Sequence, residues 1–134
     1  MNIRVRQGWQ AWLVAAPLCL LLGCGGSGDT VKVTGNVLLD GQPVEQGDIV
    51  FRASDGSAAD AAKIEGGAFT LQTKPGSKRV EISAMRESAT PAPDGLPSYE
   101  NYIPKKYNEA STLTAEVTES GDNDFTFELQ SEGG

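Results

Sequence analysis

Residues 31–39 read Val-Lys-Val-Thr-Gly-Asn-Val-Leu-Leu, and this stretch decides the fold. Along it, apolar side chains alternate with polar ones: Val31, Val33, Val37 and Leu39 against Lys32, Thr34 and Asn36. Successive side chains of a β-strand point to opposite faces, so a period of two predicts a strand with one buried face. Asp40-Gly41 then predicts a turn, because Gly tolerates positive φ. Pro43 predicts an irregular connection before the next strand.

The same alternation recurs in six further segments downstream. Gly66-Gly67 separates two of them by two residues and predicts a β-hairpin. No segment shows the 3.6-residue apolar spacing of an amphipathic helix. The apolar faces of the six segments are Ile49, Phe51 and Ala53; residues 61–65; Phe69 and Leu71; Val80, Ile82 and Ala84; Leu113, Ala115 and Val117; and Phe125, Phe127 and Leu129.

Seven short strands, each with a single apolar face, predict one all-β domain over residues 31–130. Two antiparallel sheets would bury those faces against each other, so the expected architecture is a seven-stranded antiparallel β-sandwich. The side chains expected inside are Val33, Val37, Ile49, Phe51, Phe69, Leu71, Val80, Ile82, Leu113, Val117, Phe125, Phe127 and Leu129.

The amino-acid composition excludes several classes of function. The chain carries a formal net charge of −7 and has no histidine. Without histidine the usual general base and His-ligated zinc are excluded, so we expect a non-catalytic protein with no catalytic residue and no metal or cofactor. So acidic a domain is not expected to bind nucleic acid. A calcium site at Asp122 and Asp124 is conceivable, but Asp is also an ordinary turn former, and we assign no metal site there.

The N-terminal segment has the layout of a cleavable secretory signal. Arg4 and Arg6 are basic, residues 11–22 are apolar, and the small residue Gly23 precedes Cys24. The apolar stretch is shorter than the ~20 residues that a membrane-spanning helix needs. We therefore expect a signal peptide at residues 1–23, a flexible tether at residues 24–30 and a disordered tail at residues 131–134.

Leu21-Leu22-Gly23-Cys24 resembles the bacterial lipoprotein box. The resemblance implies cleavage between Gly23 and Cys24, lipidation of Cys24, and attachment of the protein to a membrane through that lipid. Three acyl chains would hold it there permanently, since even one buried chain gives measurable binding. Gly25 stands where Asp would indicate inner-membrane retention, which favours the outer membrane of the bacterial cell envelope. The alternative is an ordinary cysteine after an ordinary signal peptide.

A second resemblance covers residues 31–129. Its motifs are Val33-Thr34-Gly35-Asn36-Val37, Asp40-Gly41-Gln42-Pro43-Val44, Gly47-Asp48-Ile49-Val50-Phe51 and Gly66-Gly67-Ala68-Phe69-Thr70-Leu71. In this order they resemble carboxypeptidase-regulatory-like and transthyretin-like (prealbumin-like) domains, and residues 102–117 resemble small bacterial lipoproteins that carry such a domain. The resemblance implies a β-sandwich without catalytic machinery of its own. The hydroxyisourate hydrolase branch depends on histidines, so its activity is not expected here.

Residues 85–110 form the longest expected connection, and connections beyond about 12–15 residues are usually functional or disordered. Residues 87–97 are proline-rich and predict a mobile, polyproline-like segment. The second half holds candidate binding residues, whose aromatic and basic side chains could stack on a sugar or grip a peptide: Tyr99, Tyr102, Lys105, Lys106 and Tyr107. In the alternative, Tyr102, Ile103 and Tyr107 fold back and plug the open end of the sandwich.

These observations predict a lipid-anchored, non-catalytic protein of the cell envelope that serves as a structural or protein-interaction module. The alternative function is a carbohydrate- or peptidoglycan-binding module that uses the Tyr99 to Tyr107 segment. The expected partners are the membrane, through the lipid on Cys24, and an envelope protein or glycan.

Overall fold

The computed structural model describes residues 29–131. The predicted signal peptide, its cleavage site at Gly23 and Cys24, and most of the predicted tether lie outside the described residues. The described part consists of strands joined by turns and one short 3-10 helix. Its elements are β1 (Val31–Leu39), β2 (Gln42–Pro43), β3 (Gln46–Ala53), β4 (Ala59–Glu65), β5 (Ala68–Thr73), β6 (Gly76–Ser83), β7 (Met85–Glu87), β8 (Tyr99–Asn101), η1 (Lys105–Tyr107), β9 (Thr114–Val117) and β10 (Asp124–Leu129).

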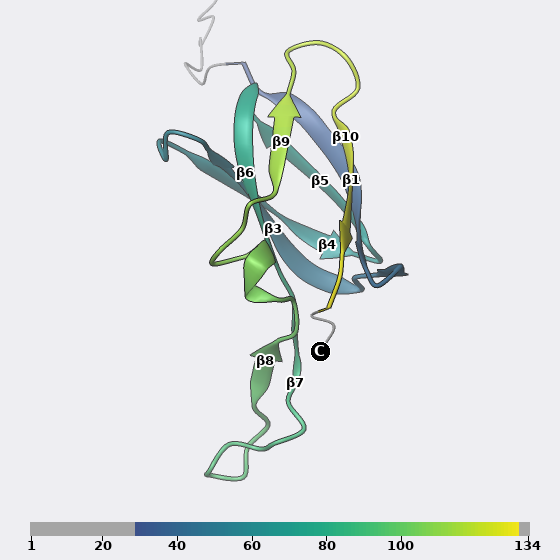
Figure 1. Ribbon diagram of the computed structural model, residues 1–134, viewed down its shortest axis with the longest axis vertical. Helices are drawn as coiled ribbons and strands as arrows, with labels where there is room; N and C mark the ends of the chain where they lie inside the picture. The colour runs from purple at the N-terminus through teal and green to yellow at the C-terminus, as the bar shows by residue number, and fades with distance from the viewer. Residues whose placement is uncertain (1–28, 132–134) are drawn as a thin grey trace, which may run out of the picture.

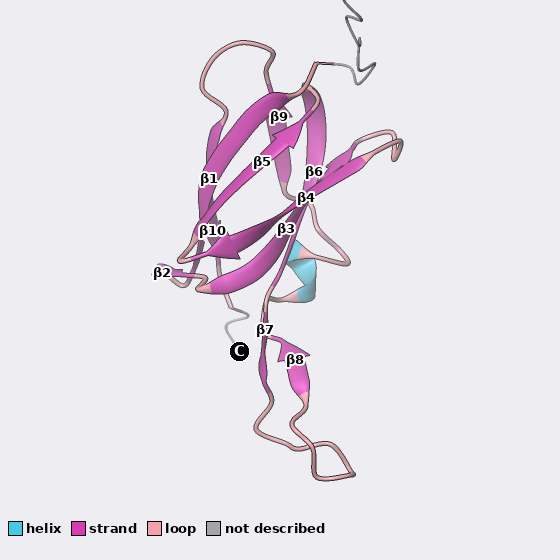
Figure 2. Ribbon diagram, turned by 180° about the vertical axis from the view of Figure 1, so that it is seen from behind, coloured by secondary structure: helices cyan, strands magenta, loops and turns pink. Residues whose placement is uncertain are grey.

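Eight strands form one curled sheet that wraps around the core (Figure 1, Figure 2). Their order is β10-β1-β5-β4-β3-β6-β9, with β2 added to β1. The prediction of an all-β fold is confirmed, and each of the seven predicted strands is present. Two separate sheets are not confirmed, because the ladder continues from β4 to β5 through the pair Glu65 and Ala68.

The prediction of a purely antiparallel fold is wrong at one place. β10 pairs with β1 in parallel, from Thr34 opposite Asp124 to Leu39 opposite Leu129. β9 and β10 lie at the two edges of the sheet, and the connection 118–123 carries the chain across the open side. The chain therefore enters β10 in the direction of β1, because it has crossed to the far edge instead of turning back beside β9.

Two glycine-containing turns set the register of the strands that they join. Asp40 and Gly41 have φ of 51° and 80°, and Gly66 and Gly67 have φ of 57° and 81°. Two successive positive values are typical of the type I′ turn, whose twist matches that of the flanking strands. The predicted turn and the predicted hairpin are therefore confirmed.

One expectation near the first turn is wrong. Residues after it do not form an irregular connection, since Pro43 pairs with Leu38 in the short strand β2. An edge strand tolerates proline because its outer side needs no N–H donor. The backbone N–H of Ser131, at which the predicted tail begins, donates to Asp40 Oδ1 at 3.0 Å.

The core is built around Phe51, which has no exposed surface. Its ring centroid lies 6.0 Å from that of Phe69 on β5 and 6.2–6.3 Å from those of Phe125 and Phe127 on β10. These contacts span the core from one half of the curled sheet to the other. Of the thirteen side chains expected inside, all but Leu113 and Phe125 are buried. These two are half-buried and pack against the core, Phe125 from β10 and Leu113 from the position just before β9.

The open side between β9 and β10 is closed at each end by a polar side chain. At one end the buried Asn123 accepts a hydrogen bond from Thr118 N (2.9 Å) and donates one to Thr118 O (3.0 Å). At the other end the Tyr107 hydroxyl accepts a hydrogen bond from Gln130 N at 3.0 Å. These hydrogen bonds lie at the two ends of the open side, where no backbone ladder joins β9 to β10.

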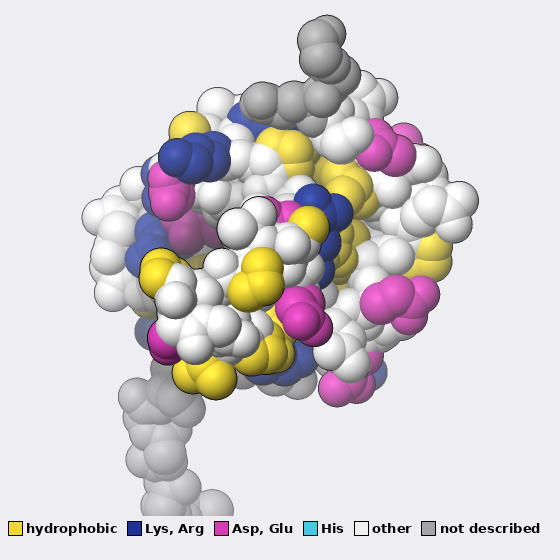
Figure 3. Space-filling model, turned by 90° about the horizontal axis from the view of Figure 1, so that it is seen from below, with side chains coloured by type: hydrophobic (Ala, Val, Ile, Leu, Met, Phe, Trp, Pro, Cys, Tyr) yellow, Lys and Arg dark blue, Asp and Glu magenta, His cyan; other side chains and the backbone are white. Residues whose placement is uncertain are grey.

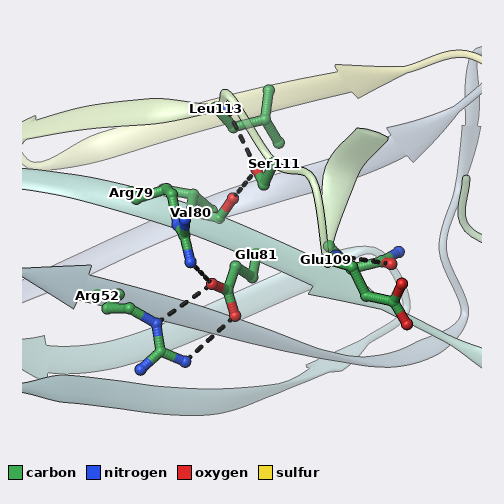
Figure 4. A network of polar contacts seen from close by, with 8 residues as sticks. Arg52, Arg79, Val80, Glu81, Glu109, Ser111 and Leu113 are labelled. Atoms are coloured by element: carbon green, nitrogen blue, oxygen red, sulfur yellow. Dashed lines mark hydrogen bonds and ion pairs between the residues drawn. The ribbon is translucent and has the colours of Figure 1, made fainter. Parts of the chain in front are cut away.

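The outer face of β3 and β6 carries an ion-pair network (Figure 4). Glu81 accepts hydrogen bonds from Arg52 Nε at 3.2 Å and from Arg79 at 2.5 Å. On the inner side of the same strand, the Ser111 hydroxyl donates to Val80 O and ties the segment before β9 to β6. Hydrogen bonds from Arg52, and secondarily from Arg79, hold the pKa of the Glu81 carboxyl below its ordinary value of 4.5.

Glu81→Gln should reduce the dependence of stability on pH. A carboxyl whose folded pKa is lowered stabilises the fold above its unfolded pKa and loses that contribution as the pH falls through the folded value. The variant should lose about 0.5–1 kcal/mol of unfolding free energy near neutral pH, and that deficit should shrink below about pH 4. Urea unfolding at both pH values measures this. Glu128→Gln, at an exposed position of β10, is the control, and an equal deficit there would count against the network.

Candidate functional site

The most distinctive feature of the molecule is a hairpin that leaves the curled sheet, here called the arm (residues 85–101). After β6 the chain continues through the buried Ala84 into β7, and β8 returns antiparallel to it. Figures 1 and 2 show the arm projecting from the lower end of the sheet. No long irregular connection therefore spans residues 85–110, contrary to expectation.

Backbone hydrogen bonds continue towards the tip of the arm. Ser88 N donates to Ser98 O at 2.8 Å, and Ala92 N donates to Leu96 O at 3.0 Å. Hydrogen bonds therefore cross the segment for which a mobile, polyproline-like backbone was predicted. The donors are Ser88 and Ala92, and none of the prolines of this stretch is needed as an N–H donor.

The root of the arm is held by one asparagine. Asn101 Oδ1 accepts hydrogen bonds from Ala84 N and from Ile103 N, both at 3.1 Å. Tyr102 N donates to Ala84 O at 3.0 Å, and Ile103 is 2% exposed. The arm therefore starts from a fixed base, and its direction relative to the sheet is set by buried contacts.

The structure divides the five predicted binding residues among different surroundings. Tyr99 lies on the arm and is 64% exposed, whereas Tyr102 and Tyr107 are half-buried and pack against the core. Lys105 and Lys106 are exposed on η1, and the Lys106 ammonium lies 5.1 Å from the centre of the Tyr107 ring. The five do not form one patch. The alternative, in which Tyr102, Ile103 and Tyr107 plug the end of the fold, agrees with these contacts.

Tyr107→Phe should lower the free energy of unfolding by about 0.5–1 kcal/mol, because it removes the acceptor for Gln130 N and keeps the ring. Tyr99→Phe is the matched control, since no described residue bonds the Tyr99 hydroxyl and the ring is exposed. Urea unfolding followed by circular dichroism measures both. Equal losses in the two variants would show that Tyr107 does not close the open side.

The arm has two chemically different faces. Side chains two apart on a strand share a face, and so do residues directly opposite each other. Met85, Glu87 and Tyr99 thus share the outer face, with Glu87 opposite Tyr99. The inner face carries Arg86 and Glu100, whose side chains form an ion pair at 2.8 Å. Arg86 also lies over the Tyr102 ring, 5.5 Å from its centre.

The arm also gathers the exposed apolar side chains. Met85, Leu96 and Tyr99 are 57%, 61% and 64% exposed, and among residues 29–131 they are the large hydrophobic side chains that lie open to solvent. Figure 3 looks onto this end of the molecule and shows hydrophobic side chains on the surface of the arm. Single exposed hydrophobic residues are common on protein surfaces. Here, however, all three lie on one projecting element, which indicates that this element contacts a partner.

A groove lies where the outer face of the arm meets the sheet. It has a volume of about 420 Å³ and is lined by Gln46, Gly47, Asp48, Lys63, Ile64, Glu65 and Met85. Two of the lining residues, Asp48 and Lys63, form an ion pair at 2.5 Å. Met85 is the point at which the groove and the arm join. The candidate site is therefore the groove together with the outer face of the arm.

The sequence alone does not predict this groove. Its residues come from β3, β4 and β7, and no motif connects them. The one available signal was Met85, an apolar residue in the outward register of the strand pattern that Val80, Ile82 and Ala84 define. An apolar residue on the solvent side of a strand is a reason to expect a contact there.

Within the described residues, no three Cys, Asp or Glu side chains come together in a way that could hold a metal ion. None of the helices in this range is long and apolar enough to cross a membrane. The four ion pairs between described residues all lie at partly or fully exposed positions.

Comparisons with known proteins add little. No protein-family model matches the chain, and no curated protein matches it significantly. Among solved structures it is similar to a 9R-lipoxygenase from Cyanothece PCC8801, with 18% sequence identity and a TM-score of 0.34. The matched region covers 75% of this chain and 16% of the lipoxygenase chain. A likeness of that degree carries no argument about fold or function.

Proposed function

We propose that this chain is a lipid-anchored, non-catalytic interaction module of the bacterial cell envelope, and that the arm is its contact element. The observation that carries the proposal is the gathering of exposed apolar side chains on the arm, at Met85, Leu96 and Tyr99. A two-stranded ribbon is marginally stable by itself in water. An arm with so much exposed apolar surface is therefore best explained by a partner that covers it.

The position of the arm supports this proposal. β1 begins at one end of the curled sheet, and the arm projects from the opposite end (Figure 1). A lipid on Cys24 would tether the domain a few residues before Val31. The arm would then point away from the membrane, towards proteins of the envelope.

The lack of histidine supports a non-catalytic role, because the usual general base is then missing. The resemblance to carboxypeptidase-regulatory-like domains, which act as accessories, is consistent with it. We propose that the curled sheet is a form of the transthyretin-like β-sandwich.

The anchor is tested by the intact mass of the protein extracted from membranes of the producing bacterium. The expected mass is that of a chain starting at Cys24 with acyl groups added, and Cys24→Ser should leave the protein unlipidated. Detection of the unmodified chain from Met1 to Gly134 in wild-type cells would refute the anchor.

The contact element is tested by photo-crosslinking in the same cells. A photoreactive amino acid in place of the exposed Tyr99 should form a discrete adduct. The same amino acid in place of Glu119, an exposed residue of the connection after β9, should form none. Adducts of equal yield at both positions would show that the arm has no special role. Binding of Tyr99→Ala to a glycan array, compared with wild type, would decide the alternative of a carbohydrate- or peptidoglycan-binding module.

A further inference from the structure

We infer that the groove at the root of the arm binds an extended segment of a partner protein in which a basic residue stands two positions from an apolar one. This inference rests on the proposed function and specifies the chemistry of the partner. It follows from the charges, the apolar anchors and the shape of the surface formed by the groove and the outer face of the arm.

The charge of this surface favours a basic partner. Asp48, Glu65 and Glu87 present three carboxylates, against the single ammonium group of Lys63. Lys63 is already paired with Asp48, whereas Glu65 and Glu87 have no ion-pair partner among residues 29–131. The carboxylates of Glu65 and Glu87 are therefore available to a Lys or Arg side chain of a partner. Complementary charge would make this surface favour such a partner.

The apolar anchors share this surface with the carboxylates. Met85 lines the groove, and Glu87 and Tyr99 continue its face along the arm. Met adapts its shape to different apolar partners, and Tyr presents an amphipathic ring, so the pair suits a partner side chain of moderate size. Successive side chains of an extended chain point to opposite sides, so residues two apart would meet the anchors and the carboxylates.

Other occupants fit this surface less well. A second copy of the chain would bring a net charge of −7 against the same charge, and its own groove would present more carboxylates. An anionic lipid surface would meet the same repulsion. A positively charged protein segment would be attracted to this surface and not repelled by it.

The test uses the full-length protein purified from the producing cells and three short fluorescent peptides. The first carries leucine and lysine in turn at every second position, with serine between them. The second has glutamate in place of lysine, and the third has serine in place of leucine. Fluorescence anisotropy should show binding of the first and at least tenfold weaker binding of the other two. No binding of the first peptide, or equal binding of the first and second, would overturn the inference.

Variants locate the binding. Glu65→Gln/Glu87→Gln should weaken binding of the leucine-lysine peptide by about tenfold, since each exposed charge pair contributes a few-fold. Met85→Ser should weaken it by about fivefold. Lys63→Gln should strengthen it about twofold to threefold, because Asp48 then has no competing partner. The matched control Glu119→Gln/Glu128→Gln removes the same charge elsewhere and should leave the affinity within about twofold.

If the control and Glu65→Gln/Glu87→Gln weaken binding of the peptide equally, the peptide is attracted only by the net charge of the protein. That result would overturn the inference. Sedimentation at the same concentrations should give a monomer. A dimer that Met85→Ser dissociates would assign the groove to a second copy, and would also overturn it. The proposed function is judged separately, by the mass of the membrane-extracted protein and the adduct at Tyr99, so either can fail without the other.

Discussion

Gly35→Ala should lower the free energy of unfolding by about 3 kcal/mol or more, the largest effect expected of any single methyl group in the chain. A Cβ atom at this position would lie 2.0 Å from Phe125 O on β10 and 2.7 Å from the Phe69 ring on β5. Non-bonded carbon atoms prefer separations of about 3.5–4.0 Å. Backbone on one side and a buried ring on the other leave no easy way to relax.

Urea unfolding followed by circular dichroism measures the loss. Gly41→Ala is the control: nothing lies within 4 Å of its Cβ position, and its φ is 80°. It should cost about 1 kcal/mol, from backbone strain alone. If Gly35→Ala costs no more than Gly41→Ala, the close approach of β1, β5 and β10 at Gly35 is wrong.

Phe51→Ala should destabilise the protein by about 3–5 kcal/mol, which is a large share of the 5–15 kcal/mol typical of a domain. The ring has no exposed surface and contacts three other aromatic rings. Removing it would leave a cavity between the two halves of the curled sheet. The ladder between the strands β4 and β5 of these halves consists of the single pair Glu65 and Ala68.

Phe125→Ala provides the comparison for Phe51→Ala. Phe125 packs on the same cluster but is half-buried at the edge of the sheet. Its loss should cost about 1–2 kcal/mol, because water already covers part of the ring. A cost for Phe125→Ala equal to that for Phe51→Ala would show that the cluster is not centred on Phe51.

Much of the fold was predictable because strand alternation and turn chemistry are local properties. The pattern of residues 31–39 placed Val33 and Val37 in the core, and it placed Gly35 in the same inward register. It could not tell why a glycine stands there. The reason is the Phe69 ring, which belongs to β5 and covers the glycine from the neighbouring strand.

The candidate site was predictable only in part. The segment with the tyrosines was singled out by its length and composition, and Tyr99 is indeed exposed on the arm. The sequence could not separate Tyr99 from Tyr102 and Tyr107. The burial of these two depends on Ala84, Gln130 and other residues distant in the chain.

The sequence by itself determined the number of long strands, their inward faces, two of the turns, the acidity of the domain and the expectation of a lipid anchor at Cys24. These follow from periods, turn residues and charges within short stretches. Only the tertiary structure decided the parallel pairing of β1 with β10, the single curled sheet, and the arm with its groove. Each of these features depends on which strands, far apart in the sequence, can bury their apolar faces together. A local pattern of residues contains no information about such distant pairings.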